Sequence, residues 1–217
     1  MNIQSKLPNV GTTIFTVMSQ MAIDCNAINL GQGFPDFNPH PELVRLVSQA
    51  MEQGHNQYAA MAGIPALRQQ ISKKIKTSYG HDYDPDTEIT VTSGATEALM
   101  ATILALVNAG DEVIVIEPVY DLYIPAIVLA GGVPVVVPMT APNQENPKYS
   151  MDWQRLRDSI TAKTRMIILN FPHNPTGSIL AEHELDILES IVQDTGILIL
   201  SDEAYEHIVF DNEPQIG

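Results

Sequence analysis

From residue 89 onward, short apolar runs alternate with segments that have the periodicity of amphipathic helices. A run of this length followed by such a helix is typical of a βαβ unit, so the pattern predicts an α/β fold with a mainly parallel sheet sandwiched by helices. The expected strands are 89–92, 112–116, 133–137, 165–169 and 197–200. The expected helices between them are 95–108, 121–129, 152–160 and 181–194. Two earlier helices are expected at 41–53 and 64–79.

The first forty residues have no regular period, because Gly11, Gly31, Gly33 and Pro35 interrupt it. We therefore expect an irregular N-terminal arm over residues 1–40 and the α/β domain over residues 41–217. The one long loop expected in the domain is 138–148, which contains three prolines and two asparagines.

The charge balance excludes some classes of partner. Eleven Lys and Arg face 26 Asp and Glu, which gives a net charge of −15. Nucleic acids and anionic membranes both require a basic face, so neither is expected as a partner. The single Cys25 and the histidines show no metal-ligand spacing. With no apolar signal segment and no membrane-length apolar stretch, the sequence favours a cytoplasmic protein.

Ligands of parallel α/β sheets bind at the carboxyl ends of the strands, and three motifs follow expected strands there. Residues 93–98 are small except for Glu97 and open a helix, so their N–H groups suit an anion, although an ordinary capped turn fits equally well. In 117–123, Tyr120 either stacks on a ligand ring or packs as an ordinary tyrosine. In 170–177, Asn-Pro and Thr-Gly are turn signals that also hold Asn174 rigidly as a neutral donor.

A fourth motif places Asp202 directly after the apolar strand 197–200. A carboxylate at the end of a buried strand is costly unless it meets a positive partner. The same pattern is typical of a Walker B strand, but that reading requires a Gly-x-x-x-x-Gly-Lys-Ser/Thr loop, and no glycine of the sequence precedes a lysine. A Gly-x-Ser-x-Gly elbow is also absent from the sequence, so a serine hydrolase is not indicated.

Taken together and in this order, the motifs resemble class I/II aminotransferases, which are fold-type I pyridoxal-phosphate enzymes. The resemblance covers nearly the whole chain and is closest to the branch of methionine aminotransferases and kynurenine–oxoglutarate (glutamine) transaminases. The motifs that carry it are 174–177 (Asn-Pro-Thr-Gly), 201–205 (Ser-Asp-Glu-Ala-Tyr), 29–36, 56–58 and 11–15.

The resemblance implies a pyridoxal 5'-phosphate cofactor, amino acid and 2-oxo acid substrates, and a homodimer. Asp202 would keep the pyridine nitrogen protonated, which makes the ring an electron sink for the substrate carbanion. Asn174 and Tyr205 would hydrogen-bond the phenolic oxygen of the ring, and Tyr120 would stack on its face. The remaining implied contacts are Gly94, Ala95 and Thr96 on the phosphate, Tyr58 on the phosphate of the neighbouring subunit's cofactor, and Gly33 and Phe15 on the substrate side.

One part of the family's pattern is not in the sequence. The family's Schiff-base lysine lies in a Ser-x-x-Lys segment after the strand of Asp202, and the sequence ends at Gly217 before such a segment. The lysine is both the covalent anchor and the proton-moving base, so we expect the chain to be an incomplete pyridoxal-phosphate-binding large domain, without the C-terminal small domain and with little or no transamination of its own. The alternatives are a non-catalytic remnant and a lyase or decarboxylase of the same fold.

Overall fold

The computed structural model describes residues 4–33, 35 and 37–210. They form two compact units. The helical unit is Val10–Val91, and the sheet unit is formed by the residues before it and by the chain from Thr92 onward. Phe34 and Asp36, which belong to the sequence motif 29–36, lie outside the described residues. The division of this chain into an arm over 1–40 and an incomplete cofactor-binding domain over 41–217 stays a prediction.

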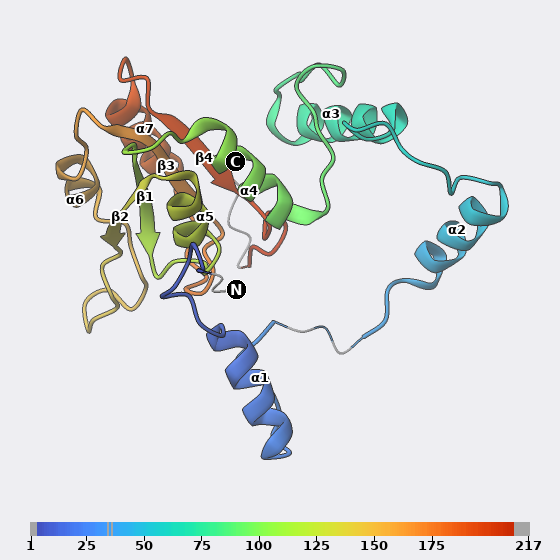
Figure 1. Cartoon of the computed structure of the whole chain (residues 1–217), viewed down its shortest axis with the longest axis horizontal. Coiled ribbons are helices and arrows are strands. Elements are labelled where there is room, and N and C mark those ends of the chain that lie inside the picture. The colour runs from blue at the N-terminus through green and yellow to red at the C-terminus, as the bar shows by residue number, and fades with distance from the viewer. Residues whose placement is uncertain (1–3, 34, 36, 211–217) are drawn as a thin grey trace. The chain divides into compact units, whose positions relative to one another are not determined.

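The sheet unit contains four parallel strands in the order β2-β1-β3-β4 (Figure 1). The strands are β1 (Glu112–Glu117), β2 (Val133–Pro138), β3 (Thr164–Asn170) and β4 (Leu198–Asp202). Their ends differ from the predicted ones by at most two residues. The α/β class and the parallel sheet are therefore confirmed.

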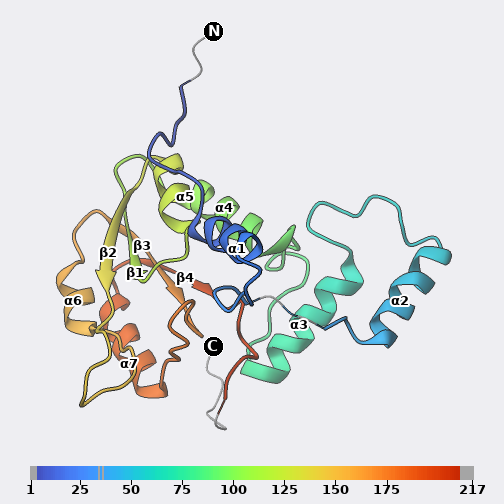
Figure 2. The same ribbon diagram turned by 90° about the horizontal axis from the view of Figure 1, so that it is seen from below.

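Alternating side chains along the strands build two apolar layers, one on each face of the sheet. Ile114 and Ile116 of β1 pack with the cluster that includes α6 (Trp153–Asp158) and α7 (Glu182–Val192). Val113 and Val115 pack on the opposite face with α4 (Gly94–Leu106) and α5 (Tyr123–Ala130). Figure 2 shows the strands between these two pairs of helices. Because both faces of the strands are covered, their sequences are continuous apolar runs rather than alternating ones.

The helical unit contains α1 (Ile14–Asp24), α2 (Pro41–Glu52) and α3 (Pro65–Tyr79). The positions predicted for α2 and α3 are confirmed, whereas the expectation that the first forty residues are irregular is wrong at α1. Thr13 caps α1 by accepting a hydrogen bond from the Thr16 N–H. The glycines that suggested irregularity all lie outside 14–24, so they interrupt the chain around this helix and not within it.

The predicted strand at 89–92 is also wrong, because these residues form no strand. The Val91 N–H donates instead to the carbonyl of Ala62, at 3.0 Å, within the helical unit. A Cβ atom on Gly63 would lie 2.5 Å from the Val91 Cγ2, so a glycine is what allows this close approach. The segment therefore pairs with a turn of the helical unit and not with the sheet.

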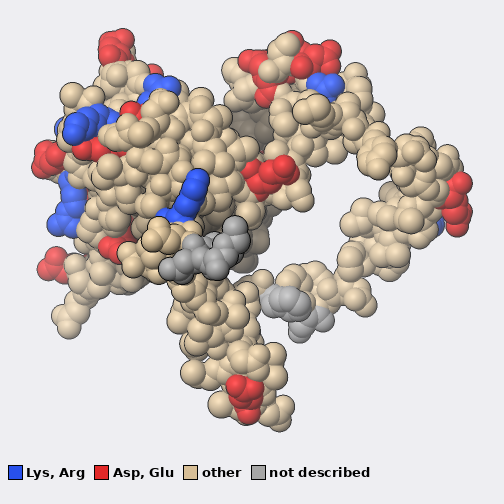
Figure 3. Space-filling view, viewed as in Figure 1, with Lys and Arg blue, Asp and Glu red and all other residues tan. Residues whose placement is uncertain are grey.

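No helix in the described part of the chain is long and apolar enough to cross a membrane. On the face shown in Figure 3, Lys and Arg side chains are interspersed with Asp and Glu instead of forming one broad basic patch.

Candidate active site

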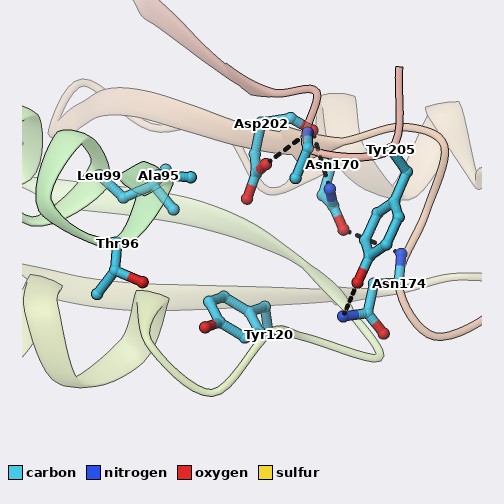
Figure 4. Close-up of a pocket in the computed structure, with 9 residues that line it drawn as sticks. Ala95, Thr96, Leu99, Tyr120, Asn170, Asn174, Asp202 and Tyr205 are labelled. Atoms are coloured by element: carbon cyan, nitrogen blue, oxygen red, sulfur yellow. Dashed lines mark hydrogen bonds between the residues drawn. The ribbon is translucent and has the colours of Figure 1, made fainter. Parts of the chain in front are cut away.

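A pocket of about 140 Å³ opens where β3 and β4 end and α4 begins (Figure 4). The nine residues that line it are Ala95, Thr96, Leu99, Tyr120, Asn170, Asn174, Asp202, Ala204 and Tyr205. All four predicted strand-end motifs contribute to it, and Leu99 follows the first of them by one residue. The volume is below the several hundred Å³ of ordinary ligand pockets.

Asp202 is the buried carboxylate of the pocket, and two donors hold it. The Tyr123 hydroxyl donates to its Oδ2 at 2.6 Å, and the Ala204 N–H donates to its Oδ1 at 3.1 Å. Burial first, and the bond to Asp202 second, raise the pKa of the Tyr123 phenol far above its ordinary value. Tyr123 therefore keeps its proton near neutral pH and remains a donor to this carboxylate.

A chain of amide groups connects β4 to the loop that follows β3. Asn170 Nδ2 donates to the carbonyl of Asp202 at 2.9 Å, and Asn170 Oδ1 accepts from the Asn174 N–H at 2.9 Å. Asn174 Nδ2 in turn donates to the Tyr205 hydroxyl at 3.4 Å, at the long limit for such a bond. Figure 4 shows Asn174 and Tyr205 pointing toward each other on one side of the pocket. Both side chains are thus placed with polar atoms at its edge.

Tyr120 lies across the pocket from Asp202 (Figure 4). Its ring packs edge-on against the ring of Tyr123, with centroids 5.6 Å apart and an interplanar angle of 75°. Tyr123 starts α5 and is almost fully buried. Tyr123 therefore contacts two of the four residues for which the resemblance implies ring contacts, Tyr120 and Asp202.

The opening turn of α4 supplies the opposite wall. Gly94 has a φ of +77°, a conformation that other residues rarely adopt, and it places Ala95 and Thr96 in the first turn. The N–H groups of a first turn have no partners within the helix, which makes them donors for an anion. The Ser93 N–H is bonded to the carboxylate of Glu97, and the Gly94 N–H is bonded to the Thr92 carbonyl. The next donors of this turn that could face an anion are the N–H groups of Ala95 and Thr96.

The structure brings together six of the residues predicted to contact the cofactor, and Gly94 adjoins them. These six are Ala95, Thr96, Tyr120, Asn174, Asp202 and Tyr205. Tyr58, Gly33 and Phe15 belong to the helical unit, whose position relative to the pocket is not defined, and the side chain of Tyr58 is fully exposed. Their roles remain predictions.

Sequence reasoning missed Tyr123 and Asn170. Tyr123 stands three residues after Tyr120, so the start of a helix turns its side chain back toward the same strand ends. Asn170 ends a strand after four apolar residues, Asp202 ends the neighbouring strand, and the two are register partners. The sequence signal that could have identified Asn170 is a polar residue at the end of an apolar strand, next to a second strand that also ends in a polar residue.

Comparison with known proteins assigns the chain to a family. The family model described as aminotransferase class I and II matches residues 26–216. A methionine aminotransferase of Escherichia coli is 46% identical over 210 residues, which is 97% of this chain and 53% of that protein. A kynurenine–oxoglutarate transaminase of Dictyostelium discoideum is 38% identical over 94% of this chain and 50% of its own length.

Solved structures agree with this assignment. The structure of Escherichia coli YbdL, reported with a methionine aminotransferase function, has a TM-score of 0.94 and 44% identity, over 100% of this chain and 56% of that one. N-succinyldiaminopimelate aminotransferase of Mycobacterium tuberculosis has a TM-score of 0.92 and 40% identity, over 99% of this chain and 55% of that one. The chain thus spans about half the length of these relatives. On this evidence the chain belongs to the class I and II aminotransferases, the family that its strand-end motifs resemble.

Proposed function

We propose that the pocket holds pyridoxal 5'-phosphate, the cofactor of this family, and that the chain is the cofactor-binding part of an enzyme that transfers an amino group to a 2-oxo acid. The relatives act on methionine, N-succinyldiaminopimelate or kynurenine, so the proposed donors are methionine and aromatic, glutamine-like or kynurenine-like amino acids. The observation that carries the proposal is the buried Asp202 carboxylate, held by a protonated Tyr123 at the carboxyl end of β4.

The residues present fit this cofactor in chemical terms. The pocket combines an anionic carboxylate, a flat aromatic face, neutral edge donors and a helix start with free N–H groups. These groups match a protonated pyridine nitrogen, an aromatic ring, a phenolic oxygen and a phosphate, respectively. When bound, pyridoxal phosphate supplies an electron sink for the charge that develops on the substrate's α-carbon.

Asp202 would act as a fixed counter-charge. Its two oxygens are already held by Tyr123 and Ala204, so the carboxylate does not have to reorganise when a positive ring nitrogen approaches. Asn174 and Tyr205 would orient the ring edge with their amide and hydroxyl groups, and Tyr120 would restrict the ring's tilt. The chain's own residues thus bind and orient the ring and keep a proton on its nitrogen.

The group that moves the substrate proton is not among the residues that line the pocket, because none of them is a lysine. We propose that this lysine comes from residues beyond the given sequence, and that the 217-residue chain by itself transfers amino groups slowly or not at all. We also propose that the active protein is a cytoplasmic homodimer in which Tyr58 reaches the partner's cofactor.

The test uses a polypeptide that contains these 217 residues followed by the downstream half that the relatives have. It is supplied with pyridoxal phosphate, methionine and a 2-oxo acid, and the new amino acid is quantified. Asp202→Asn should lower kcat by orders of magnitude and affect cofactor affinity much less, because the side chain keeps its size but loses the counter-charge. A near-normal kcat in Asp202→Asn would show that this aspartate is structural and that its proposed role is wrong.

A further inference from the structure

Asn170 lines the pocket, but the proposed function gives it no contact with the cofactor. It is the last residue of β3 and is only 6% exposed. A buried side-chain amide needs partners for both its oxygen and its nitrogen. The partners that Asn170 has indicate which parts of the site this amide holds together.

The nitrogen of the amide bonds to the neighbouring strand. Asn170 and Asp202 are register partners at the ends of β3 and β4, and Asn170 Nδ2 donates to the Asp202 carbonyl at 2.9 Å. This carbonyl belongs to the residue whose carboxylate is the proposed counter-charge. The bond therefore fixes the backbone of Asp202 at the point where β4 ends.

The oxygen of the amide bonds to the loop that follows β3. Asn170 Oδ1 accepts a hydrogen bond from the Asn174 N–H at 2.9 Å, so the chain returns to Asn170 four residues after it leaves the strand. A carbonyl can only accept and an N–H can only donate, so these two partners leave a single orientation for the amide. Figure 4 shows Asn170 between Asp202 and Asn174.

We propose that Asn170 is a positioning residue that sets the spacing between Asp202 and Asn174, and with it the orientation of the cofactor ring. Under the proposed function, on which this inference rests, these two residues contact the ring at different atoms, the nitrogen and the phenolic oxygen. One planar amide of fixed size bonds the backbone of both, so neither can shift alone without breaking a buried hydrogen bond. A fixed spacing lowers the ordering cost of binding a rigid ring.

The first experiment needs no cofactor and tests the bond of the amide oxygen. Asn170→Ala removes both bonds, whereas Asn170→Asp keeps an oxygen for the Asn174 N–H and loses the donor to Asp202. Asn146→Ala is the matched control, because Asn146 is an exposed asparagine of the sheet unit whose side-chain oxygen also accepts a backbone N–H, that of Lys148.

Hydrogen–deuterium exchange of the 217-residue chain is then measured by mass spectrometry on fragments that contain the Asn174 amide. In Asn170→Ala we expect this amide to exchange about tenfold faster, because its buried acceptor is lost. In Asn170→Asp and in the Asn146 control, it should exchange within about threefold of the unmodified chain. Amides of β1 and β2 report that the sheet is intact. Unchanged exchange in Asn170→Ala, or equally faster exchange in both Asn170 variants, would overturn the proposal.

The second experiment is a double-mutant cycle on the Kd for pyridoxal phosphate. Asn174→Ala removes a ring contact, and this loss should matter less once Asn170 no longer holds Asn174 in place. We expect the increase in Kd caused by Asn174→Ala to be at least about threefold smaller in the Asn170→Ala background, and unchanged in the Asn146→Ala background. Additive effects of the two changes would overturn the positioning role, because a direct contact of Asn170 with the cofactor, or a general loss of stability, gives additivity.

A third measurement tests the bond to Asp202, in the polypeptide that carries the downstream half. Asp202→Asn lowers kcat under the proposed function, and this decrease should be at least about threefold smaller in the Asn170→Ala background. An equal decrease in both backgrounds would show that Asn170 does not position Asp202. If the unmodified chain binds no pyridoxal phosphate, the proposed function is wrong for this chain, while the exchange data still decide whether Asn170 holds the loop of Asn174.

Discussion

Removing one oxygen atom from Tyr123 tests the most buried polar contact of the site. In Tyr123→Phe the ring stays, so the edge-on contact with Tyr120 and the packing of α5 are preserved. Only the 2.6 Å hydrogen bond to Asp202 Oδ2 is lost. A hydrogen bond to a charged group contributes about 1.5–3 kcal/mol, and Asp202 is a buried residue. We therefore expect the free energy of unfolding to fall by about 2 kcal/mol.

The assay is urea unfolding of the cofactor-free chain at pH 7.5, followed by tryptophan fluorescence. Trp153 is the single tryptophan of the sequence, and it packs in the sheet unit, so its signal reports the unit that contains the site. Tyr149→Phe is the matched control, because the group of Tyr149 that accepts a hydrogen bond from Ser178 is its backbone carbonyl. The control should change the free energy by no more than about 0.5 kcal/mol.

A double-mutant cycle with Asp202→Asn isolates the pair. In that background the phenol donates to a neutral amide, and Tyr123→Phe should cost only about 1 kcal/mol. The difference gives a coupling energy of about 1 kcal/mol between the two residues. Equal losses in both backgrounds would refute the reasoning, because they would show that Tyr123 stabilises the chain without acting on the charge of Asp202.

Three further predictions concern packing, pH and assembly. Gly132→Ala should lower the free energy of unfolding by about 1–3 kcal/mol in the same urea assay, because a Cβ on Gly132 would lie 2.6 Å from Val107 Cγ1. Gly11→Ala is a near-neutral control, since a Cβ there meets no atom within 4 Å. Burial lowers the pKa of His173 below its ordinary value of 6.5. The neutral ring therefore contributes its full stabilisation above pH 6.5, and this stabilisation is lost as the pH falls through the lowered pKa. The melting temperature should thus fall less between pH 7.5 and 5 in His173→Gln than in the unmodified chain. Light scattering of the 217-residue chain should show dimers or aggregates, since many apolar side chains of α1 and α2 are exposed, and a monodisperse monomer with a sharp melt would contradict this.

The sheet unit was predictable because its sequence is locally consistent. Each strand from β1 to β4 is an apolar run that follows a helix, so period and length identify it without tertiary information. The segment 89–92 has the same local character, yet its partner is Ala62 and not a strand. Only the tertiary structure separates the two cases, because an apolar run does not specify which backbone it will pair with.

The pocket was predictable for residues in motifs at or just after strand ends, such as Asp202 and Asn174. Tyr123 was missed because its role depends on the direction in which α5 starts, and this direction is set by packing on the sheet. His173 was likewise read as part of a turn, since nothing in its own segment indicates that the residue is buried. Patterns within one segment of the sequence do not predict contacts between loops that are distant in sequence.

The central claim is that this pocket binds pyridoxal phosphate through Asp202, and titration of the 217-residue chain tests it most directly. We expect saturable binding that dialysis reverses and that borohydride does not fix to one lysine, since no lysine lines the pocket. Asp202→Asn should weaken binding of pyridoxal phosphate but not of an analogue with carbon in place of the ring nitrogen, because only the former places a charge at Asp202. The claim would be contradicted if binding were not saturable or if a dialysis-resistant adduct formed on one specific lysine. Equal effects of Asp202→Asn on both compounds would also contradict it.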